Sequence, residues 1–225
     1  TVLELRWIDG EAESVPLSAP KGLAIHGDTL FVTDIDSVRA FDRGTGEYLG
    51  ARGVPGATFL NDLTVGADGS LYVSDSGLNA DFSSSGTDAV YRFEDGEAVT
   101  VARGADLNGP NGLAAHDGGI VMVPFGAARV LRLPSDSAAE PEVLAELPGG
   151  QLDGVVRLDD GSLLVSSWET QTVYRVPAEG GGPPEAVIEG VASPADIGWD
   201  AGRRRVLIPV FTENRLELRS IIDNR

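Results

Sequence analysis

One short phrase recurs five times along the chain: turn-forming residues followed by the start of an apolar segment. The copies centre on anchor residues spaced 40, 50, 42 and 42 positions apart, namely Gly22, Asp62, Gly112, Gly154 and Asp196. A period of about 40 to 50 residues with several short strands in each unit indicates a β-propeller, whose blades stand around one axis. The repeats therefore predict an all-β fold in which residues far apart in sequence meet at the axis.

The fourth repeat illustrates how the sequence encodes a blade of four strands. An inner strand over 154–158 and a second strand over 162–167 are joined by an Asp-Gly pair, which is typical of a tight hairpin. Residues 172–176 alternate apolar and polar as a half-exposed strand does, and 185–189 form the outer strand after a Gly/Pro break. Because Asp-Gly specifies a turn at this place, we assign Asp160 no chemistry.

The two ends of the chain decide how many blades the sequence predicts. Before the four complete blades we expect two strands, over 2–7 and 14–17, and the chain does not begin with Met. Three further strands are expected after the last anchor, over 197–199, 206–210 and 215–219. We therefore expect one β-propeller domain over 1–225 with six-bladed architecture, an incomplete first blade and missing upstream strands. The alternative is a closed five-bladed ring in which 14–17 closes the last blade.

Composition narrows the classes of function. The formal charge of −18 at pH 7 argues against a nucleic-acid partner, because phosphate neutralisation needs basic stripes. No apolar run reaches the roughly 18 residues of a membrane span, and the absence of cysteine excludes disulfides and thiolate metal sites. An acidic, cysteine-free propeller suits a bacterial periplasm or exterior, and a salt-adapted cytoplasm would give the same charge.

The residue before each anchor is expected at one rim of the axis, where the innermost strand of each blade begins. These residues are Lys21, Asn61, Asn111, Asp153 and Ala195, and the anchors add the carboxylates of Asp62 and Asp196. Amide and carboxylate oxygens are the ligands that Ca²⁺ prefers. We therefore predict a divalent-cation site held by Asn61, Asn111 and Asp153, with Ca²⁺ favoured and Mg²⁺, Mn²⁺ or Zn²⁺ as alternatives. The competing interpretation is that these residues only shape a turn.

The two histidines are predicted to lie away from this rim. His26 and His116 each follow their anchor by four residues, which is roughly 13 Å along a strand. They belong to the opposite face, at the first hairpin turn, so a Ser/His/Asp triad at the rim is not expected. Hydrolysis at the rim would have to rely on a metal and carboxylates.

The connections between second and third strands return to the rim and could cover it. The second strands are expected to end at five residues that could wall a pocket for a small-molecule substrate: Asp34, Asp75, Phe125, Trp168 and Phe211. The second repeat carries the longest connection, 77–89, which is polar and rich in Ser and Gly. Such a loop is interpreted either as a lid or specificity loop, or as an idle surface insertion.

Three phrases resemble the senescence marker protein/gluconolactonase family of six-bladed β-propellers. They are Asn61-Asp62, Pro110-Asn111-Gly112-Leu113 and Leu152-Asp153-Gly154. The resemblance implies that one divalent cation in the channel assists the opening of a lactone ring. It implies that Asn111 and Asp153 are metal ligands, that Asp153 is the catalytic base, and that Asn61 contacts substrate or metal. The metal would polarise the carbonyl and acidify a water.

The chain departs from this family at two places. The family's glutamate ligand comes from the first strand of blade one, which this chain is expected to lack. The arginine expected shortly before Asn61 is absent, since 58–60 read Thr-Phe-Leu. The fold inference survives both departures, whereas a sugar-lactone substrate is not implied. The alternative function is a non-catalytic scaffold resembling NHL-repeat propellers, which should show an exposed basic or aromatic face and no polar ring at the axis.

Overall fold

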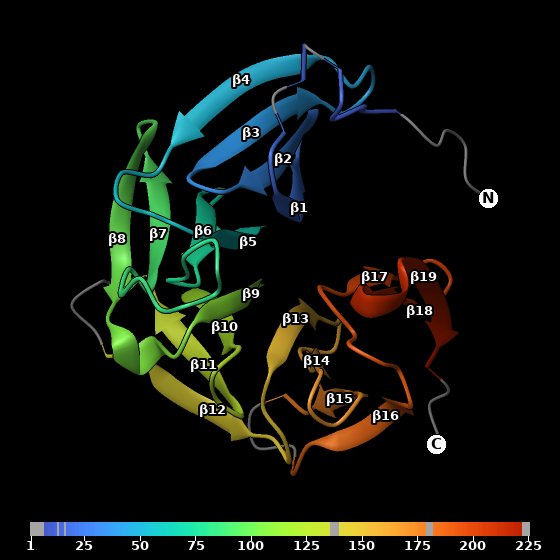
Figure 1. Ribbon diagram of the computed structural model, residues 1–225. Helices are drawn as coiled ribbons and strands as arrows, with labels where there is room; N and C mark the ends of the chain where they lie inside the picture. Colours follow the sequence, from blue (N-terminus) through green and yellow to red (C-terminus); the bar gives the residue numbers. More distant parts are fainter. Residues whose placement is uncertain (1–6, 13, 16, 136–139, 179–181, 222–225) are drawn as a thin grey trace.

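The computed structural model describes residues 7–12, 14–15, 17–135, 140–178 and 182–221. Within these residues the chain folds into five sheets, four of them with four strands and one with three. The sheets stand side by side around a central axis like the blades of a propeller (Figure 1). In the described part of the chain, no helix has both the length and the apolar character needed to span a membrane.

Each blade is an antiparallel meander whose strands follow one another from the axis outward in chain order. Blade one contains β1 (Pro20–His26), β2 (Thr29–Asp34), β3 (Ser37–Asp42) and β4 (Tyr48–Gly53). Blade two contains β5 (Leu60–Val65), β6 (Leu71–Asp75), β7 (Ala89–Glu94) and β8 (Glu97–Arg103). Blade three contains β9 (Pro110–His116), β10 (Gly119–Pro124), β11 (Arg129–Pro134) and β12 (Glu142–Glu146). Blade four contains β13 (Leu152–Arg157), β14 (Leu163–Ser167), β15 (Thr172–Val176) and β16 (Glu185–Glu189). Blade five contains β17 (Gly198–Asp200), β18 (Arg205–Val210) and β19 (Arg215–Ser220).

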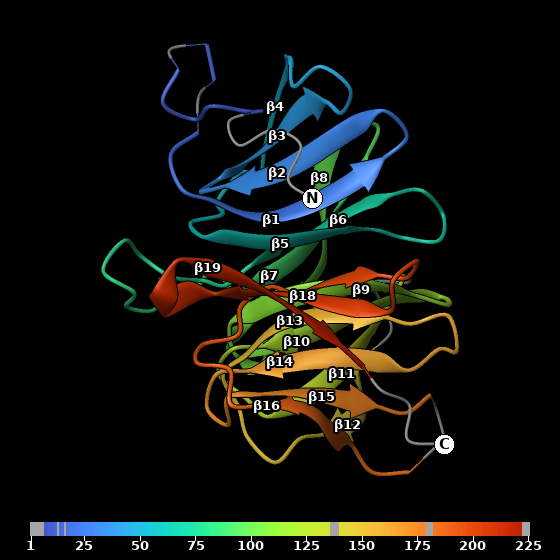
Figure 2. The same ribbon diagram turned by 90° about the vertical axis from the view of Figure 1, so that its right-hand side faces the viewer.

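The hydrophobic core consists of four clusters, one between each pair of consecutive blades. Successive side chains of a strand point to opposite faces, so a middle strand serves two clusters at once. On β6, Tyr72 packs toward blade three and Val73 packs toward blade one. Figure 2 shows the innermost strands β1, β5, β9 and β13 lying one above another, and neighbours in this series contact each other.

A buried hydroxyl on the second strand joins a blade to the next one. Ser74 Oγ accepts the backbone N–H of Asp62 in its own blade at 3.0 Å and donates to the carbonyl of Asn111 in blade three at 2.7 Å. The same link recurs in blades one and four through Thr33 and Ser166. These hydroxyls fix the position of each inner strand along the axis relative to the neighbouring inner strand. They thereby fix the relative positions of the rim residues.

Removing one of these hydroxyls is expected to destabilise the fold. Ser74→Ala leaves two buried backbone groups without a partner, which costs about 1–3 kcal/mol in the free energy of unfolding. Denaturant unfolding measures this loss, and Ser83→Ala in an exposed loop is the matched control, expected to change stability little. Equal unfolding free energies for the two variants would show that the Ser74 link carries no stability.

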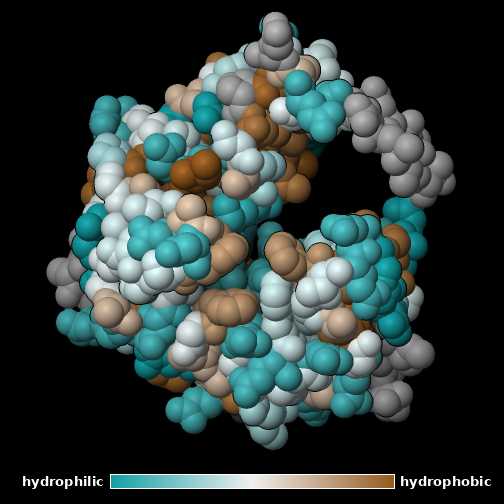
Figure 3. Space-filling model, viewed as in Figure 1, coloured by the Kyte–Doolittle hydropathy of each residue, from teal (hydrophilic) through white to brown (hydrophobic). Residues whose placement is uncertain are grey.

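The described residues form five blades. This number does not support the predicted six-bladed architecture and agrees with the alternative prediction of five blades. The four complete blades and the three strands after the last anchor are confirmed. The expected strand over 14–17 is wrong, because the described residues there form turns. It therefore does not close blade five, and Figures 1 and 3 show an opening between blades one and five. Of the expected strand over 2–7, only Trp7 lies within the described residues.

Candidate functional site at the channel rim

The predicted rim residues lie where the innermost strands are irregular. The pairing of the first and second strands shifts register between Leu60 and Leu63 in blade two and between Leu152 and Val155 in blade four, and blades one and three shift at the equivalent places. Such bulges interrupt the ladder and re-aim side chains, and they are frequent beside active sites. The recurring phrase in the sequence is therefore the signature of a bulge at the rim.

Glycine is required at three anchors because the inner strands approach each other closely there. A Cβ on Gly112 would lie 2.3 Å from the carbonyl oxygen of Asp153, and one on Gly154 would lie 2.2 Å from the backbone nitrogen of Ile197. A Cβ on Gly22 would similarly collide with Asp62. These contacts explain why the anchor is glycine in blades one, three and four.

A cavity of about 680 Å³ runs along the axis beside the bulges. Asp62 and Asp196 contribute carboxylates to its lining. Most of the remaining lining is apolar, from the inner strands of all five blades, and includes Leu23, Leu63, Leu113, Val155 and Ile197. Arg157 and Asp159 also line the cavity, so the channel carries charged as well as apolar groups, whereas Asn61, Asn111 and Asp153 are not among its lining residues.

Three carboxylates interact around this end of the channel. Burial raises the pKa of Asp153 to about 8, the charge of Asp196 adds to the rise, and the Trp168 side chain opposes it. Burial raises the pKa of Asp196 to about 7. The pKa of Asp62 is raised well above its usual value by burial and by Asp196 and Asp153, although its carboxylate accepts the backbone N–H groups of Leu63 and Leu113, both at 2.7 Å.

The two rim asparagines use their amide N–H groups and leave their amide oxygens available. Asn61 Nδ2 donates to Ser76 Oγ at 3.0 Å, and Asn111 Nδ2 donates to the carbonyl of Leu152 at 3.3 Å. Neither Oδ1 accepts a hydrogen bond from the described residues. Oriented oxygens without a partner, together with a buried carboxylate, form a donor set that suits a hard cation.

A divalent cation fits the electrostatics of this site. Buried like charges are unfavourable unless they are protonated or neutralised by a bound cation. The basic residue of the rim, Lys21, donates to the carbonyl of Ala19 at 3.0 Å and lies 4.1 Å from the centre of the Phe59 ring. Burial lowers the pKa of Lys21, which also disfavours its charge. Among the described residues, no three His, Cys, Asp or Glu side chains form a metal-binding group, so amide oxygens would have to complete the site.

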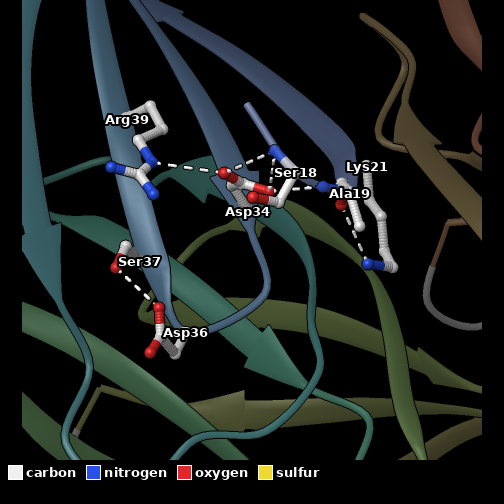
Figure 4. A network of polar contacts seen from close by, with 7 residues as sticks. All are labelled: Ser18, Ala19, Lys21, Asp34, Asp36, Ser37 and Arg39. Atoms are coloured by element: carbon white, nitrogen blue, oxygen red, sulfur yellow. Dashed lines mark hydrogen bonds and ion pairs between the residues drawn. The ribbon is translucent and has the colours of Figure 1, made fainter. Parts of the chain in front are cut away.

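The predicted wall residues Asp34 and Asp75 are the last residues of their second strands, whereas Trp168 directly follows the second strand of blade four. Their carboxylates accept hydrogen bonds from backbone N–H groups. Asp34 is buried and accepts the N–H groups of Ser18 and Ala19 as well as the guanidinium of Arg39 (Figure 4). Asp75 is equally buried and accepts three backbone N–H groups, those of Thr58, Phe59 and Gly77. The side chains that reach the rim come from the residue directly after the second strand, as in Phe125, Trp168 and Phe211, and not from the last residue of that strand.

Three predicted aromatic residues form a continuous row at the rim. The ring centres of Phe125 and Trp168 lie 5.6 Å apart, and those of Trp168 and Phe211 lie 5.2 Å apart. A second pair, Phe59 and Phe82, lies 5.9 Å apart in blade two and was not predicted as part of the site. The sequence did contain evidence for this pair, because Phe59 stands two residues before Asn61 and Phe82 lies in the 77–89 loop.

The histidines are where the sequence places them. His26 ends β1 and His116 ends β9, at the hairpins that lead to the second strands. The rim residues lie at the opposite ends of the inner strands, so the predicted placement of both histidines away from the rim is confirmed.

Comparison with known proteins agrees with this architecture. Among solved structures, the fold is similar to a gluconolactonase from Xanthomonas campestris, with 20% identity, 89% of this chain and 72% of that chain covered, and a TM-score of 0.68. It is similar to regucalcin from Agrobacterium tumefaciens, described as a calcium-binding protein (17% identity, 93% and 71% covered, TM-score 0.67). It is also similar to virginiamycin B lyase from Staphylococcus aureus (16% identity, 92% and 68% covered, TM-score 0.68).

At these identities the similar structures establish the fold alone. A search of the curated proteins found no match. The sequence family described as SMP-30/Gluconolactonase/LRE-like region matches residues 1–196, which is most of the chain. The five-bladed propeller with its bulged rim therefore belongs to the SMP-30/gluconolactonase/LRE-like family.

Proposed function

We propose that this protein is a cation-dependent lactone hydrolase that works at the channel rim. The observation that carries the proposal is the placement of the half-buried Asp153 carboxyl at the same bulged rim as the Asn61 and Asn111 amides, where burial raises its pKa to about 8. A group whose pKa lies near the working pH is suited to take and return a proton. Family membership and the similarity to a gluconolactonase support a lactone as the substrate class.

Asn61, Asn111 and Asp153 would hold the cation, with Ca²⁺ favoured by an all-oxygen donor set. When bound, such an ion polarises a carbonyl and lowers the pKa of a water. The amide N–H groups of both asparagines are held by the protein, which keeps their oxygens oriented. Asp62 and Asp196 would contribute negative charge from the channel side.

Asp153 performs the proton transfer in this scheme. Its carboxylate takes a proton from the water that attacks the lactone carbonyl carbon. As the ring C–O bond breaks, the same proton passes to the departing ring oxygen, so that the product is the open hydroxy acid. Because a bound cation favours the ionised carboxylate, the activity at a limiting cation concentration should rise with pH as Asp153 loses its proton.

The alternative, a non-catalytic binding scaffold, predicts an exposed basic or aromatic face without a polar ring at the axis. The rim has an aromatic row, and it also has the ring of amides and carboxylates. Buried carboxylates are costly in a purely structural role, because each must be kept protonated or neutralised. The polar ring therefore favours the hydrolase.

A direct assay tests the proposal. Proton release from a panel of sugar and aliphatic lactones is followed in a pH-stat with Ca²⁺, Mg²⁺, Mn²⁺ or Zn²⁺ added. We expect turnover above the spontaneous rate with at least one cation, and Ca²⁺ to be the most effective. Stabilisation by a cation without turnover of any lactone would contradict the hydrolase and favour the scaffold.

A further inference from the structure

Aromatic side chains lie in the segments beside the candidate site in four of the five blades. We define the aromatic mouth as Phe59, Phe82, Phe125, Trp168 and Phe211. Phe125, Trp168 and Phe211 come from three consecutive blades, and Phe59 and Phe82 come from blade two. Neighbouring rings within each group lie 5.2–5.9 Å apart, within the range of favourable aromatic pairs.

The backbone places this mouth directly beside the rim residues. The N–H of Phe125 donates to the carbonyl of Gly109 at 2.9 Å, and the N–H of Trp168 donates to the carbonyl of Gln151 at 3.0 Å. These carbonyls precede Asn111 and Asp153 by two residues. The indole N–H of Trp168 is buried without a well-formed hydrogen bond among the described residues, yet it is near enough to Asp153 to lower its pKa.

Two rings of the mouth are presented to solvent. Phe211 is 65% exposed and Phe82 is 70% exposed, whereas phenylalanine is normally an interior residue. Phe82 also has a φ of 62°, a left-handed conformation that is strained for a bulky side chain. Backbone strain of this kind is found where a side chain is held for a function.

The hydroxyl groups near the mouth are already engaged with one another. Thr58, Ser85 and Thr87 form a closed triangle of hydrogen bonds at 2.8–2.9 Å. On the other side, Ser193 Oγ and Thr212 Oγ1 pair at 2.7 Å. The other polar groups of the rim, the amide oxygens of Asn61 and Asn111 and the Asp153 carboxyl, belong to the proposed cation site. The aromatic mouth itself therefore offers few partners to the hydroxyls of a polyhydroxylated ligand.

We infer that the substrate of this site is a lactone bearing an aryl substituent, which the aromatic mouth holds while the lactone ring reaches Asp153, and that polyhydroxylated sugar lactones are poor substrates. The inference rests on the proposed function and specifies its substrate class. Phe211 and Phe82, the two rings of the mouth that are most exposed to solvent, determine specificity by contacting the substituent.

The test compares γ-phenyl-γ-butyrolactone, γ-butyrolactone and D-glucono-δ-lactone with the calcium-loaded protein. The phenyl group is expected to raise kcat/KM by about tenfold over the unsubstituted ring, which is the upper end of what one aromatic contact contributes. Phe211→Ala and Phe82→Ala should each lower this ratio several-fold. Leu49→Ala, which removes an exposed apolar side chain from the outer strand β4, should leave it unchanged.

A second measurement separates this inference from the proposed hydrolysis. Calorimetric binding of the inert lactams 5-phenyl-2-pyrrolidinone and 2-pyrrolidinone requires no turnover. Tighter binding of the phenyl lactam, lost in Phe211→Ala, would support the aromatic mouth even if no lactone were hydrolysed. Equal binding of the two lactams, or a preference for D-glucono-δ-lactone in the rate assay, would overturn the inference.

Discussion

Asp153→Asn is expected to lower kcat/KM for lactone hydrolysis by about 10³-fold or more, because it removes the group that takes the proton from water and also a charged ligand of the cation. The amide has the same shape as the carboxyl, so the fold should be preserved. At pH 8 without added cation the melting temperature should stay the same or rise, since a buried ionisable group with a raised pKa has been removed. Initial rates and thermal unfolding are measured on the same sample.

Asp68→Asn is the matched control for this variant. Asp68 is exposed in the turn after β5, where it accepts hydrogen bonds from Ser70. Its replacement should leave kcat/KM within about twofold of the parent value. Retention of full activity in Asp153→Asn would show that another group accepts the proton, and would remove Asp153 from the mechanism.

Calcium is expected to raise the melting temperature far more at pH 8 than at pH 5. The pKa values of Asp153 and Asp196 are raised in the folded state to about 8 and about 7, so the folded protein binds more protons than the unfolded chain between about pH 4 and pH 8. Their contribution to stability is therefore complete below pH 4 and is lost as pH rises through 7 and 8. A bound cation stabilises the ionised carboxylates and therefore restores the stability that is lost as pH rises.

The size of this effect follows from mass action. At a calcium concentration of about 100 times the dissociation constant, binding to the folded state adds about 2.7 kcal/mol, or roughly 5–10 °C for a domain of this size. Without the cation, the melting temperature should fall between pH 5 and pH 8, and Asp196→Asn should reduce that fall. Equal calcium shifts at the two pH values would contradict a cation bound by these carboxylates.

The fold was largely predictable because the propeller repeats itself. The strands over 172–176 and 185–189 lie where the alternation of residues predicts them, and the three strands after Asp196 begin or end within a residue or two of the predicted bounds. The six-bladed expectation depended on 2–7 and 14–17, which have no neighbouring repeat to confirm them. A single short apolar segment is compatible with a strand or with the turns found at residues 14, 15 and 17.

The positions of the candidate site were predictable and the partners of its residues were not. The constant offset from the anchors places Asn61, Asn111 and Asp153 at one rim, as the bulges confirm. The roles of Asp34 and Asp75 depend on backbone N–H groups in the segment entering each blade, which no pattern of side chains reveals. The same holds for the close approaches that require glycine at three anchors.

The central claim is that one cation site at the rim supports lactone hydrolysis. It is tested most directly by the initial rate of lactone hydrolysis at pH 8 as free calcium is varied with a chelator buffer. The account predicts negligible turnover in the chelator alone and a saturable rise with calcium. The half-saturating concentration should equal the one at which calcium raises the melting temperature. Turnover that persists unchanged in the chelator, or that does not respond to calcium or the other three cations, would contradict it.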